Sequence, residues 1–351
     1  MSKDHAGIKV FVGMSGGVDS SVTAALLKEQ GYDVTGVYMK NWSQDLPGFQ
    51  CPWKEDFQDA KRVAVQLDIP FKLYDFETEY RQKVVDYMID GYKAGITPNP
   101  DIMCNQEIKF KLFLEAALAD GADMIATGHY ARIQDGQLLA GEDANKDQSY
   151  FLYRVTEGAL RKSLMPIGEL EKPKVRAMAK QLGLATAEKK DSQGICFVGK
   201  VGIREFLEQF VETEPGEIID QFGRPIGEHD GALFYTIGQR HGLNVGGGLP
   251  YYVVGKDMDK NEVYVTTDID DKRLWRRELE LTSLHWINGT PDMARRYSVR
   301  TRYRAPLIAC TIEQTERGAR LVLSDQVRAI TPGQSAVIYD GERCLGGGIV
   351  V

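Results

Sequence analysis

The feature that most constrains this chain is a run of small residues between a predicted strand and a predicted helix. Residues 10–12 are apolar, as is typical of a buried parallel strand, and an amphipathic run with Val22 and Leu26 on one face follows them. The turn between them contains Gly16 and Gly17, which let the backbone come close to a ligand. A helix start directs free N–H groups and a positive dipole end at the same point. The sequence therefore predicts a phosphate-binding turn.

This turn lacks the lysine that follows the glycines of the common P-loop. Its order, Ser-Gly-Gly-x-Asp-Ser, resembles the pyrophosphate loop of the PP-loop ATPases, which bind ATP and open the bond at the α-phosphate. By that resemblance Asp19 holds Mg²⁺ on the phosphates, because a hard cation prefers carboxylate oxygen. The alternative is an ordinary tight turn that opens a helix, with Asp19 as an acid in its first turn.

Strands and helices alternate along the first third of the chain, which predicts an α/β fold with a doubly wound parallel sheet. The predicted strands lie at residues 10–12, 33–40, 70–74 and 123–127. Ligands of such sheets bind beyond the carboxyl ends of the strands. Three polar stretches follow strands in this way: the Ser-Gly-Gly turn, residues 39–42 and residues 128–130. We therefore expect them to converge on one ATP site.

From about residue 202 the pattern changes to short strands separated by glycine-rich turns, which predicts two small β units. We expect a catalytic domain of the PP-loop ATPase type at residues 1–203, a small, mixed or β-rich central domain at residues 204–272, and a C-terminal β-barrel at residues 273–351.

The net charge of −7 is unevenly distributed, because eleven arginines stand against eight acidic residues from Arg276 to the end. Five of them lie within ten residues with no acid among them: Arg295, Arg296, Arg300, Arg302 and Arg304. Such a basic island predicts that the barrel binds nucleic-acid phosphates, with an affinity that falls as salt rises. A solvated face of the barrel is the alternative.

Several classes of protein are disfavoured by composition. No apolar run approaches the roughly 18 residues of a membrane span, and residues 1–5 are charged, without the apolar core of a signal peptide. We therefore expect a cytoplasmic protein that does not bind membranes. Five cysteines, an odd number without paired spacing, argue against a disulfide framework.

Two of the cysteines lie in segments with the composition of polar loops. Cys104 lies near the end of residues 97–105, where two prolines predict a rigid non-helical segment just before a helix. A helix start lowers the pKa of a nearby thiol. Cys196 lies close to two lysines and a glycine. We predict that both are reactive, against the alternative of small buried hydrophobic side chains. The other three are Cys310 and Cys344, predicted to be structural, and Cys51, which stays undecided.

Seven stretches of the chain have the composition of functional motifs. They are Gly-Met-Ser-Gly-Gly-Val-Asp-Ser at 13–20, Asn-Pro-Asp-x-x-Cys-Asn at 99–105, Ala-Thr-Gly-His-Tyr at 126–130, Lys-Asp-Gln-Ser-Tyr at 146–150, Ser-Gln-Gly-Ile-Cys-Phe at 192–197, Thr-Ile-Gly-Gln-Arg-His-Gly at 236–242 and Arg-Tyr-Arg at 302–304. Taken together, they resemble the motifs of the tRNA-specific 2-thiouridylases, and the resemblance covers essentially the whole length of the chain.

The resemblance implies that the C2 oxygen of the wobble uridine of certain tRNAs is replaced by sulfur. The oxygen attacks the α-phosphate of ATP and expels pyrophosphate, and sulfur then displaces AMP. Cys196 carries the incoming sulfur as a persulfide. Cys104 is the partner nucleophile, which can release sulfide by closing a disulfide with Cys196. Asp101 acts as acid and base near the target uridine.

The resemblance also implies two sets of binding residues. Those for ATP, with Asp19 also holding Mg²⁺, are Gly13, Met14, Ser15, Gly16, Gly17, Val18, Asp19, Ser20, Met39 and Gly128. Those for the flipped nucleotide and the rest of the tRNA are Asn99, Pro100, Asp101, His129, Lys146, Asp147, Gln148, Arg302, Tyr303 and Gln334. The implied sulfur donor is a sulfur-relay protein or a cysteine desulfurase.

Three alternatives stay open at this point. Another PP-loop synthetase would adenylate an oxygen but deliver nitrogen, and a non-catalytic RNA-binding protein would keep the fold without turning over ATP. In a third alternative, Cys104 and Cys196, with Asp101 or a third cysteine, hold an iron–sulfur cluster, since thiolates suit such clusters.

Overall fold

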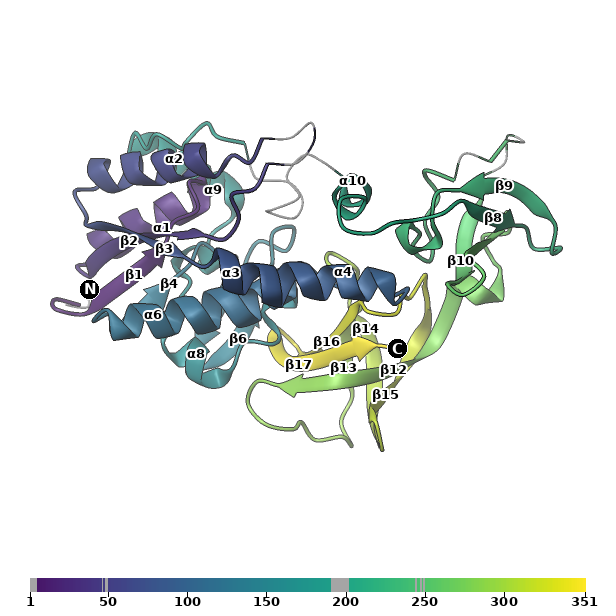
Figure 1. Cartoon of the computed structure of the whole chain (residues 1–351). Coiled ribbons are helices and arrows are strands. Elements are labelled where there is room, and N and C mark those ends of the chain that lie inside the picture. Colours follow the sequence, from purple (N-terminus) through teal and green to yellow (C-terminus); the bar gives the residue numbers. More distant parts are fainter. Residues whose placement is uncertain are drawn as a thin grey trace.

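Three folded parts follow one another along the chain (Figure 1). They are a parallel sheet with helices on both faces, a small mixed sheet, and a C-terminal antiparallel barrel. The structure is a computed structural model, and it describes residues 5–45, 47, 50–190, 202–243, 245–246, 248 and 250–351. Cys196 and the motif around it therefore lie outside the described residues.

The first part is organised around a five-stranded sheet in which every neighbouring pair is parallel. Its strand order is β3-β2-β1-β4-β7, so the first strand of the chain lies in the middle. The bounds are β1 Lys9–Gly13, β2 Asp33–Lys40, β3 Phe71–Asp75, β4 Met124–Ala126 and β7 Ser163–Leu164. The doubly wound α/β prediction is confirmed, and β7 is a strand that the sequence analysis did not predict.

Helices cover both faces of this sheet because β1 is apolar on both sides. Val10 and Val12 belong to one buried cluster with side chains of α1, α2 and α9, whereas Phe11 belongs to another cluster with Phe113 of α6. In Figure 1 the two groups of helices lie on opposite faces of the sheet. The helices of this part are α1 Val18–Glu29, α2 Trp53–Gln66, α3 Glu77–Tyr80, η1 Arg81–Val85, α4 Asp86–Lys93, α5 Pro100–Met103, η2 Cys104–Leu112, α6 Phe113–Ala119, α7 Ser149–Leu152, α8 Glu157–Arg161, η3 Pro166–Glu169 and α9 Lys172–Gln181.

The segment that carries Cys104 differs from its prediction. The non-helical part ends at Asn99, and from Pro100 the chain runs through α5, the π-helix η2 and α6 without a break. Asn99 caps this helix, because its side-chain oxygen accepts a hydrogen bond from the Ile102 N–H at 3.3 Å. Pro100 occupies the first turn, where its missing N–H costs nothing. Asp101 and Cys104 therefore lie within a helix.

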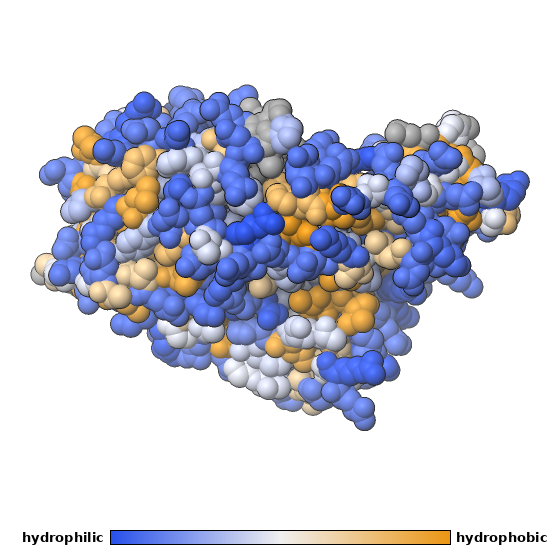
Figure 2. Space-filling model, in the orientation of Figure 1, coloured by the Kyte–Doolittle hydropathy of each residue, from blue (hydrophilic) through white to orange (hydrophobic). Residues whose placement is uncertain are grey.

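The central part is a four-stranded sheet in the order β10-β11-β8-β9, preceded by a short helix. Its elements are α10 Ile203–Leu207, β8 Gly216–Ile219, β9 Pro225–His229, η4 Ala232–Phe234, β10 Tyr252–Asp257 and β11 Glu262–Thr266. Apolar side chains of α10 share a buried cluster with those of η1 and α4. Figure 2 shows apolar side chains between α4 and α10 on a face that is otherwise mostly hydrophilic.

The C-terminal part is an antiparallel barrel of six strands, closed by pairing of β12 with both β15 and β17. Its elements are η5 Lys272–Leu274, β12 Trp275–Trp286, β13 Tyr297–Arg300, β14 Ile308–Thr315, β15 Gly318–Arg328, β16 Ser335–Asp340 and β17 Arg343–Val350. A hairpin of the first part, β5 Ala131–Gln134 and β6 Gln137–Ala140, joins the same sheet through β17. The sequence analysis did not predict this shared sheet.

None of the helices in the described part of the chain combines the length and the apolar composition that a membrane span needs.

Several arginines of the basic island bind the protein itself. Arg300 of β13 donates a hydrogen bond to the Asp147 carboxylate at 2.8 Å, and only 15% and 3% of the two side chains are exposed. Arg304 donates to the backbone oxygen of Asn145 at 2.8 Å, and Arg295 pairs with Asp340 at 3.1 Å. The expectation that these arginines are free for phosphates is therefore wrong for Arg300. It joins the barrel to the first part instead.

The buried pair of Arg300 and Asp147 yields a prediction about stability. Arg300→Met leaves the Asp147 carboxylate buried without its cation, so it should lower the free energy of unfolding by about 3 kcal/mol. Arg295→Met removes an exposed pair and should cost less than about 1 kcal/mol. Urea titrations followed by circular dichroism measure both, and equal losses would refute the structural role of Arg300.

Candidate functional site

The Ser-Gly-Gly turn lies at the carboxyl end of β1, between β2 on one side and β4 on the other. Strand order reverses at this point, so the turn occupies the topological switch where such sheets bind ligands. Gly16 has a φ of +74°, and a side chain there would collide with the backbone of Asp56 in α2. Glycine at this position is therefore required both by the backbone conformation and by the close approach of α2.

The first turn of α1 is open to an anion. Gly17 is the N-cap, and no described side chain caps the helix start. The hydroxyl groups of Ser15 and Ser20 lie 3.3 Å apart, and the Ser20 hydroxyl accepts the Ser15 N–H at 3.2 Å. Backbone N–H groups, hydroxyl groups and the positive end of the helix dipole thus meet at one place, which suits phosphate.

Residues that follow the neighbouring strands converge on this turn, as the sequence suggested. A Cβ atom on Gly13 would lie 3.0 Å from Cε of Met39 at the end of β2. A Cβ atom on Gly128, after β4, would lie 2.8 Å from the backbone nitrogen of Ser20. The ends of three strands therefore surround the start of α1, with backbone in direct contact at Gly128.

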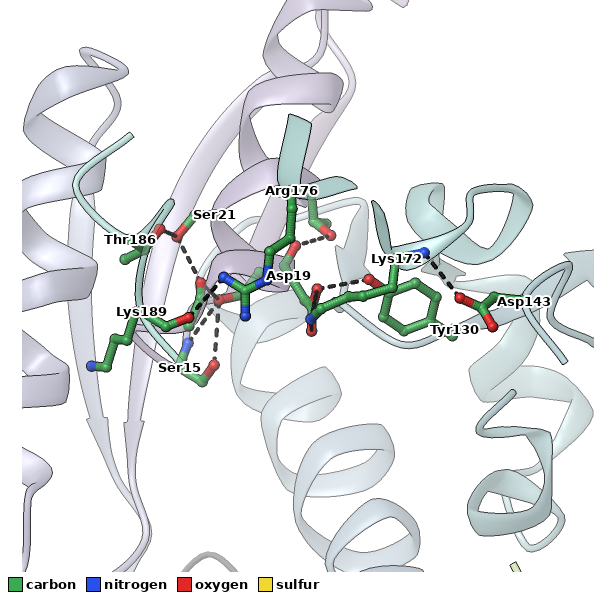
Figure 3. A network of polar contacts seen from close by, with 12 residues as sticks. Ser15, Asp19, Ser21, Tyr130, Asp143, Lys172, Arg176, Thr186 and Lys189 are labelled. Carbon is green, nitrogen blue, oxygen red and sulfur yellow. Dashed lines mark hydrogen bonds and ion pairs between the residues drawn. The ribbon is translucent and has the colours of Figure 1, made fainter. Parts of the chain in front are cut away.

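A polar network not found from the sequence surrounds Asp19 (Figure 3). The Lys172 ammonium group donates to both Asp19 carboxylate oxygens at 2.8 Å, and the Tyr130 hydroxyl donates to one of them at 2.8 Å. Lys172 is itself held through its backbone N–H, which donates to Asp143 at 3.0 Å. Lys172 is the first residue of α9 and Tyr130 is the last residue of the motif at 126–130, but nothing in their spacing connects them to Asp19.

The chain that leads toward Cys196 is attached beside the same turn. The Lys189 ammonium group pairs with Asp56 at 2.7 Å and Asp59 at 2.6 Å, both on α2. The Thr186 hydroxyl donates to the Ser21 hydroxyl of α1 at 2.9 Å. The last described residues before position 191 are therefore fixed to α2 through Lys189 and to α1 through Thr186, whose contact with Ser21 is seen in Figure 3.

Cys104 and Asp101 occupy a different environment from the polar loop that we expected. Cys104 is 8% exposed and belongs to an apolar cluster with side chains of η1, α4 and α10. Burial raises the pKa of the Cys104 thiol, although the charge of Lys109 acts to lower it. The prediction that a helix start lowers the pKa of Cys104 is therefore wrong. Burial also raises the pKa of Asp101, again against the influence of Lys109.

His129 connects the turn to the helix of Cys104. It follows Gly128 directly, is 7% exposed, and its Nε2 atom lies 3.5 Å from the Lys109 ammonium group. Burial, together with the charge of Lys109, holds the pKa of His129 well below its usual range, so the ring is neutral at pH 7. Since an ammonium group only donates, Nε2 accepts, and Nδ1–H donates to the Thr127 hydroxyl at 2.8 Å.

Some of the residues implied in tRNA binding lie near the Ser-Gly-Gly turn and the helix of Cys104, and others are committed to contacts within the protein. The Gln148 side-chain oxygen accepts the Tyr130 N–H at 3.0 Å, and Tyr303 packs against Phe151 with ring centres 4.6 Å apart. Asp147, by contrast, is 3% exposed and is committed to Arg300 and to two backbone N–H groups.

Arg302 and Gln334 also bind the protein, at a junction of all three parts. Arg302 donates to the Thr331 hydroxyl at 3.1 Å, and Gln334 donates to the backbone oxygen of Thr97 at 2.8 Å. Both line a cavity of about 360 Å³ with residues of the motif at 236–242. This arrangement fixes the segment that precedes Asn99.

The remaining described cysteines are buried or half-buried. Cys310 and Cys344 are buried in the barrel, and burial raises the pKa of Cys310 to about 12. Cys51 is half-buried, and its thiol donates to the Trp42 carbonyl at 3.5 Å. Within the part of the chain that the structure describes, no group of three His, Cys, Asp or Glu side chains could hold a metal ion.

Comparisons with known proteins place the whole chain. Three protein-family models match it: the tRNA methyl transferase HUP domain at residues 8–200, the tRNA methyl transferase PRC-barrel domain at 204–267, and the aminomethyltransferase beta-barrel domain at 276–350. The tRNA-specific 2-thiouridylase MnmA of Bacillus subtilis (strain 168) is 49% identical, covering 100% of this chain and 96% of that protein. The chain belongs to the tRNA-specific 2-thiouridylase family. The resemblance inferred from the motifs is thereby confirmed.

Other relatives agree with this assignment. A tRNA-specific 2-thiouridylase MnmA of Listeria monocytogenes serotype 4a (strain HCC23) is 48% identical, with 100% of this chain and 96% of that protein covered. Among solved structures, an NMN synthetase from Francisella tularensis has a TM-score of 0.37 at 17% identity and covers 59% of this chain and 74% of that one. At this TM-score the likeness supports no conclusion.

The backbone contact at Gly128 yields a prediction for the site. Gly128→Ala should push the first turn of α1 away from β4 and cost about 1–3 kcal/mol of unfolding free energy, the usual penalty of overpacking. Gly158→Ala is the matched control, because a Cβ atom there meets nothing within 4 Å and alanine favours the helix α8. If thermal unfolding shows the two variants to be equally stable, the contact does not constrain the site.

Proposed function

We propose that this protein transfers sulfur to the C2 position of the wobble uridine of certain tRNAs, in a reaction driven by ATP. The observation that carries the proposal is the family match along the full chain, to relatives named for this activity. The location of the Ser-Gly-Gly turn at the switch point of the sheet supports it, because adenylation needs a phosphate-binding site there.

In the first step the C2 oxygen attacks the α-phosphate of ATP, and pyrophosphate leaves. The start of α1 and the hydroxyl groups of Ser15 and Ser20 hold the phosphates. Asp19 offers Mg²⁺ the carboxylate oxygen that it prefers, and 31% of this side chain is exposed. Bound there, Mg²⁺ would neutralise charge on the departing phosphates. Lys172 now occupies both Asp19 oxygens, so we assign it to the phosphates when ATP binds.

In the second step sulfur replaces the adenylated oxygen. Cys196 carries a persulfide, whose terminal sulfur is supplied by a sulfur-relay protein or a cysteine desulfurase. The Cys104 thiolate attacks the Cys196 sulfur, the bond to the terminal sulfur breaks, and hydrosulfide is released as the two cysteines form a disulfide. Hydrosulfide attacks C2 and AMP leaves. A thiol reductant then reopens the disulfide. Asp101 exchanges the proton at the target uridine.

The anchors on either side of Cys196 support this assignment. Before it, Lys189 is fixed to α2 beside the Ser-Gly-Gly turn. After it, Phe206 and Leu207 of α10 lie in the same apolar cluster as Cys104. The described residues before Cys196 are thus attached on the nucleotide side of the site and those after it on the Cys104 side, which supports a role for Cys196 in both steps.

For tRNA we retain Asn99, Pro100, His129, Lys146, Gln148 and Tyr303 as contacts, with Asp101 at the uridine. Asp147, Arg302 and Gln334 stay in the proposal as residues that hold these groups in place through the contacts described above. Chemistry at C2 requires the uridine to leave its stack, which costs least in a single-stranded anticodon loop. We also propose that the protein acts in the cytoplasm.

The assignment of Lys172 is tested by ATP affinity. Lys172→Met should weaken ATP binding by roughly tenfold or more, since a charge-assisted contact to phosphate contributes about 1.5–3 kcal/mol. Lys174→Met, an exposed residue on the same helix, should have no effect. Titration with a fluorescent ATP analogue measures both, and an unchanged affinity in Lys172→Met contradicts the assignment.

The reaction itself is tested by thiolation of a tRNA transcript in vitro with ATP, Mg²⁺ and a persulfide source. Cys104→Ser and Cys196→Ser should each abolish 2-thiouridine, whereas Cys51→Ser should retain it. Formation of product with ammonia instead of sulfur would favour a nitrogen-delivering synthetase. Binding of tRNA without ATP turnover, indifferent to Cys196→Ser, would favour a non-catalytic RNA-binding protein. Iron and sulfide analysis after anaerobic purification tests the cluster alternative.

A further inference from the structure

Lys109 is a charged residue in the site for which neither the sequence motifs nor the steps above provide a role. It lies in the π-helix η2, five residues after Cys104. Five residues is the hydrogen-bond spacing of a π-helix, so Lys109 lies about one turn from Cys104 on nearly the same face. π-Helical turns of this kind often occur at functional sites.

The ammonium group of Lys109 has no carboxylate partner in the described ranges, unlike its neighbours. Lys83 and Lys111 both pair with Glu107, at 3.2 and 3.0 Å, and take up that charge. The polar contact of Lys109 is to the neutral ring of His129 at 3.5 Å. A partly buried cation one π-helical turn from Cys104 thus contacts an uncharged acceptor, and no carboxylate of the described residues pairs with it.

The titratable groups that act on Cys104 come from three elements. Asp101 of α5 disfavours the thiolate, whereas the hydroxyl of Tyr80 in α3 and the charge of Lys109 in η2 favour it. The side chains of α10 in this cluster, Phe206 and Leu207, do not titrate. Among the described residues, Lys109 is therefore the cation that opposes both the burial of the thiol and the negative charge of Asp101.

We propose that Lys109 is a positioning residue whose ammonium group stabilises the thiolate of Cys104 and so makes it the attacking sulfur. This inference rests on the proposed function for its purpose, since the disulfide-forming step needs a thiolate. The thiol proton leaves to water when the thiolate forms. His129 completes the arrangement by accepting a hydrogen bond from Lys109 without adding a competing charge.

The test is the pH profile of Cys104 alkylation by iodoacetamide, a neutral reagent, followed by mass spectrometry of the peptide that contains Cys104. Removing a nearby cation raises the pKa of a thiol. Lys109→Met should therefore slow alkylation about tenfold at neutral pH, the change that one pKa unit produces, while the rates converge at high pH. Lys109→Arg should restore the wild-type profile.

Lys111→Met is the matched control, because Lys111 lies on the same helix but is 49% exposed and paired with Glu107. It should leave the profile unchanged. A merely structural role for Lys109 would loosen the cluster and speed alkylation at every pH, and either that result or a superimposable Lys109→Met profile overturns the proposal. The assay needs neither ATP nor tRNA, so a failure of the thiolation reaction is distinguished from a failure of this inference.

Discussion

The contact between Gly128 and the first turn of α1 is the constraint on which the site depends. A Cβ atom at Gly128 would lie 2.8 Å from the Ser20 nitrogen, so the end of β4 and the start of α1 approach only without a side chain. Because His129 follows directly, the same contact places its ring beside Lys109 on the helix of Cys104. One backbone approach therefore joins the Ser-Gly-Gly turn to the helix that carries Cys104.

Local pattern was sufficient for the parts of the fold that are long and regular. The apolar run at 33–40 is β2 with the same bounds, and the turn after β1 lies where its glycines predicted. It failed at α5, because two prolines were interpreted as helix breakers although Pro100 lies in the first turn, where proline is tolerated. It also failed for the pKa of Cys104, since a position on a helix does not reveal how deeply the thiol is buried.

Charge partners far apart in sequence could not be predicted at all. Lys172 and Asp19 are 153 positions apart, as are Arg300 and Asp147, yet both pairs are hydrogen-bonded at 2.8 Å. A count of arginines predicts a basic surface, but it does not show which of them are neutralised across the junction with the first part. The same limitation hid the hairpin β5–β6, which extends a sheet whose other strands begin more than a hundred residues later.

Two cations of the site, Lys172 and Lys109, lie on different elements, and this arrangement matches the chemistry proposed. The phosphates that leave in the first step and the Cys104 thiolate that attacks Cys196 in the second step are both anionic, so each is stabilised by a nearby positive charge. Lys172 lies with Asp19 at the start of α1, whereas Lys109 lies on η2 beside the neutral ring of His129. Each anion thus has its own counter-charge. Because the pKa of His129 is held well below its usual range, its ring stays neutral at neutral pH and adds no further charge beside Lys109.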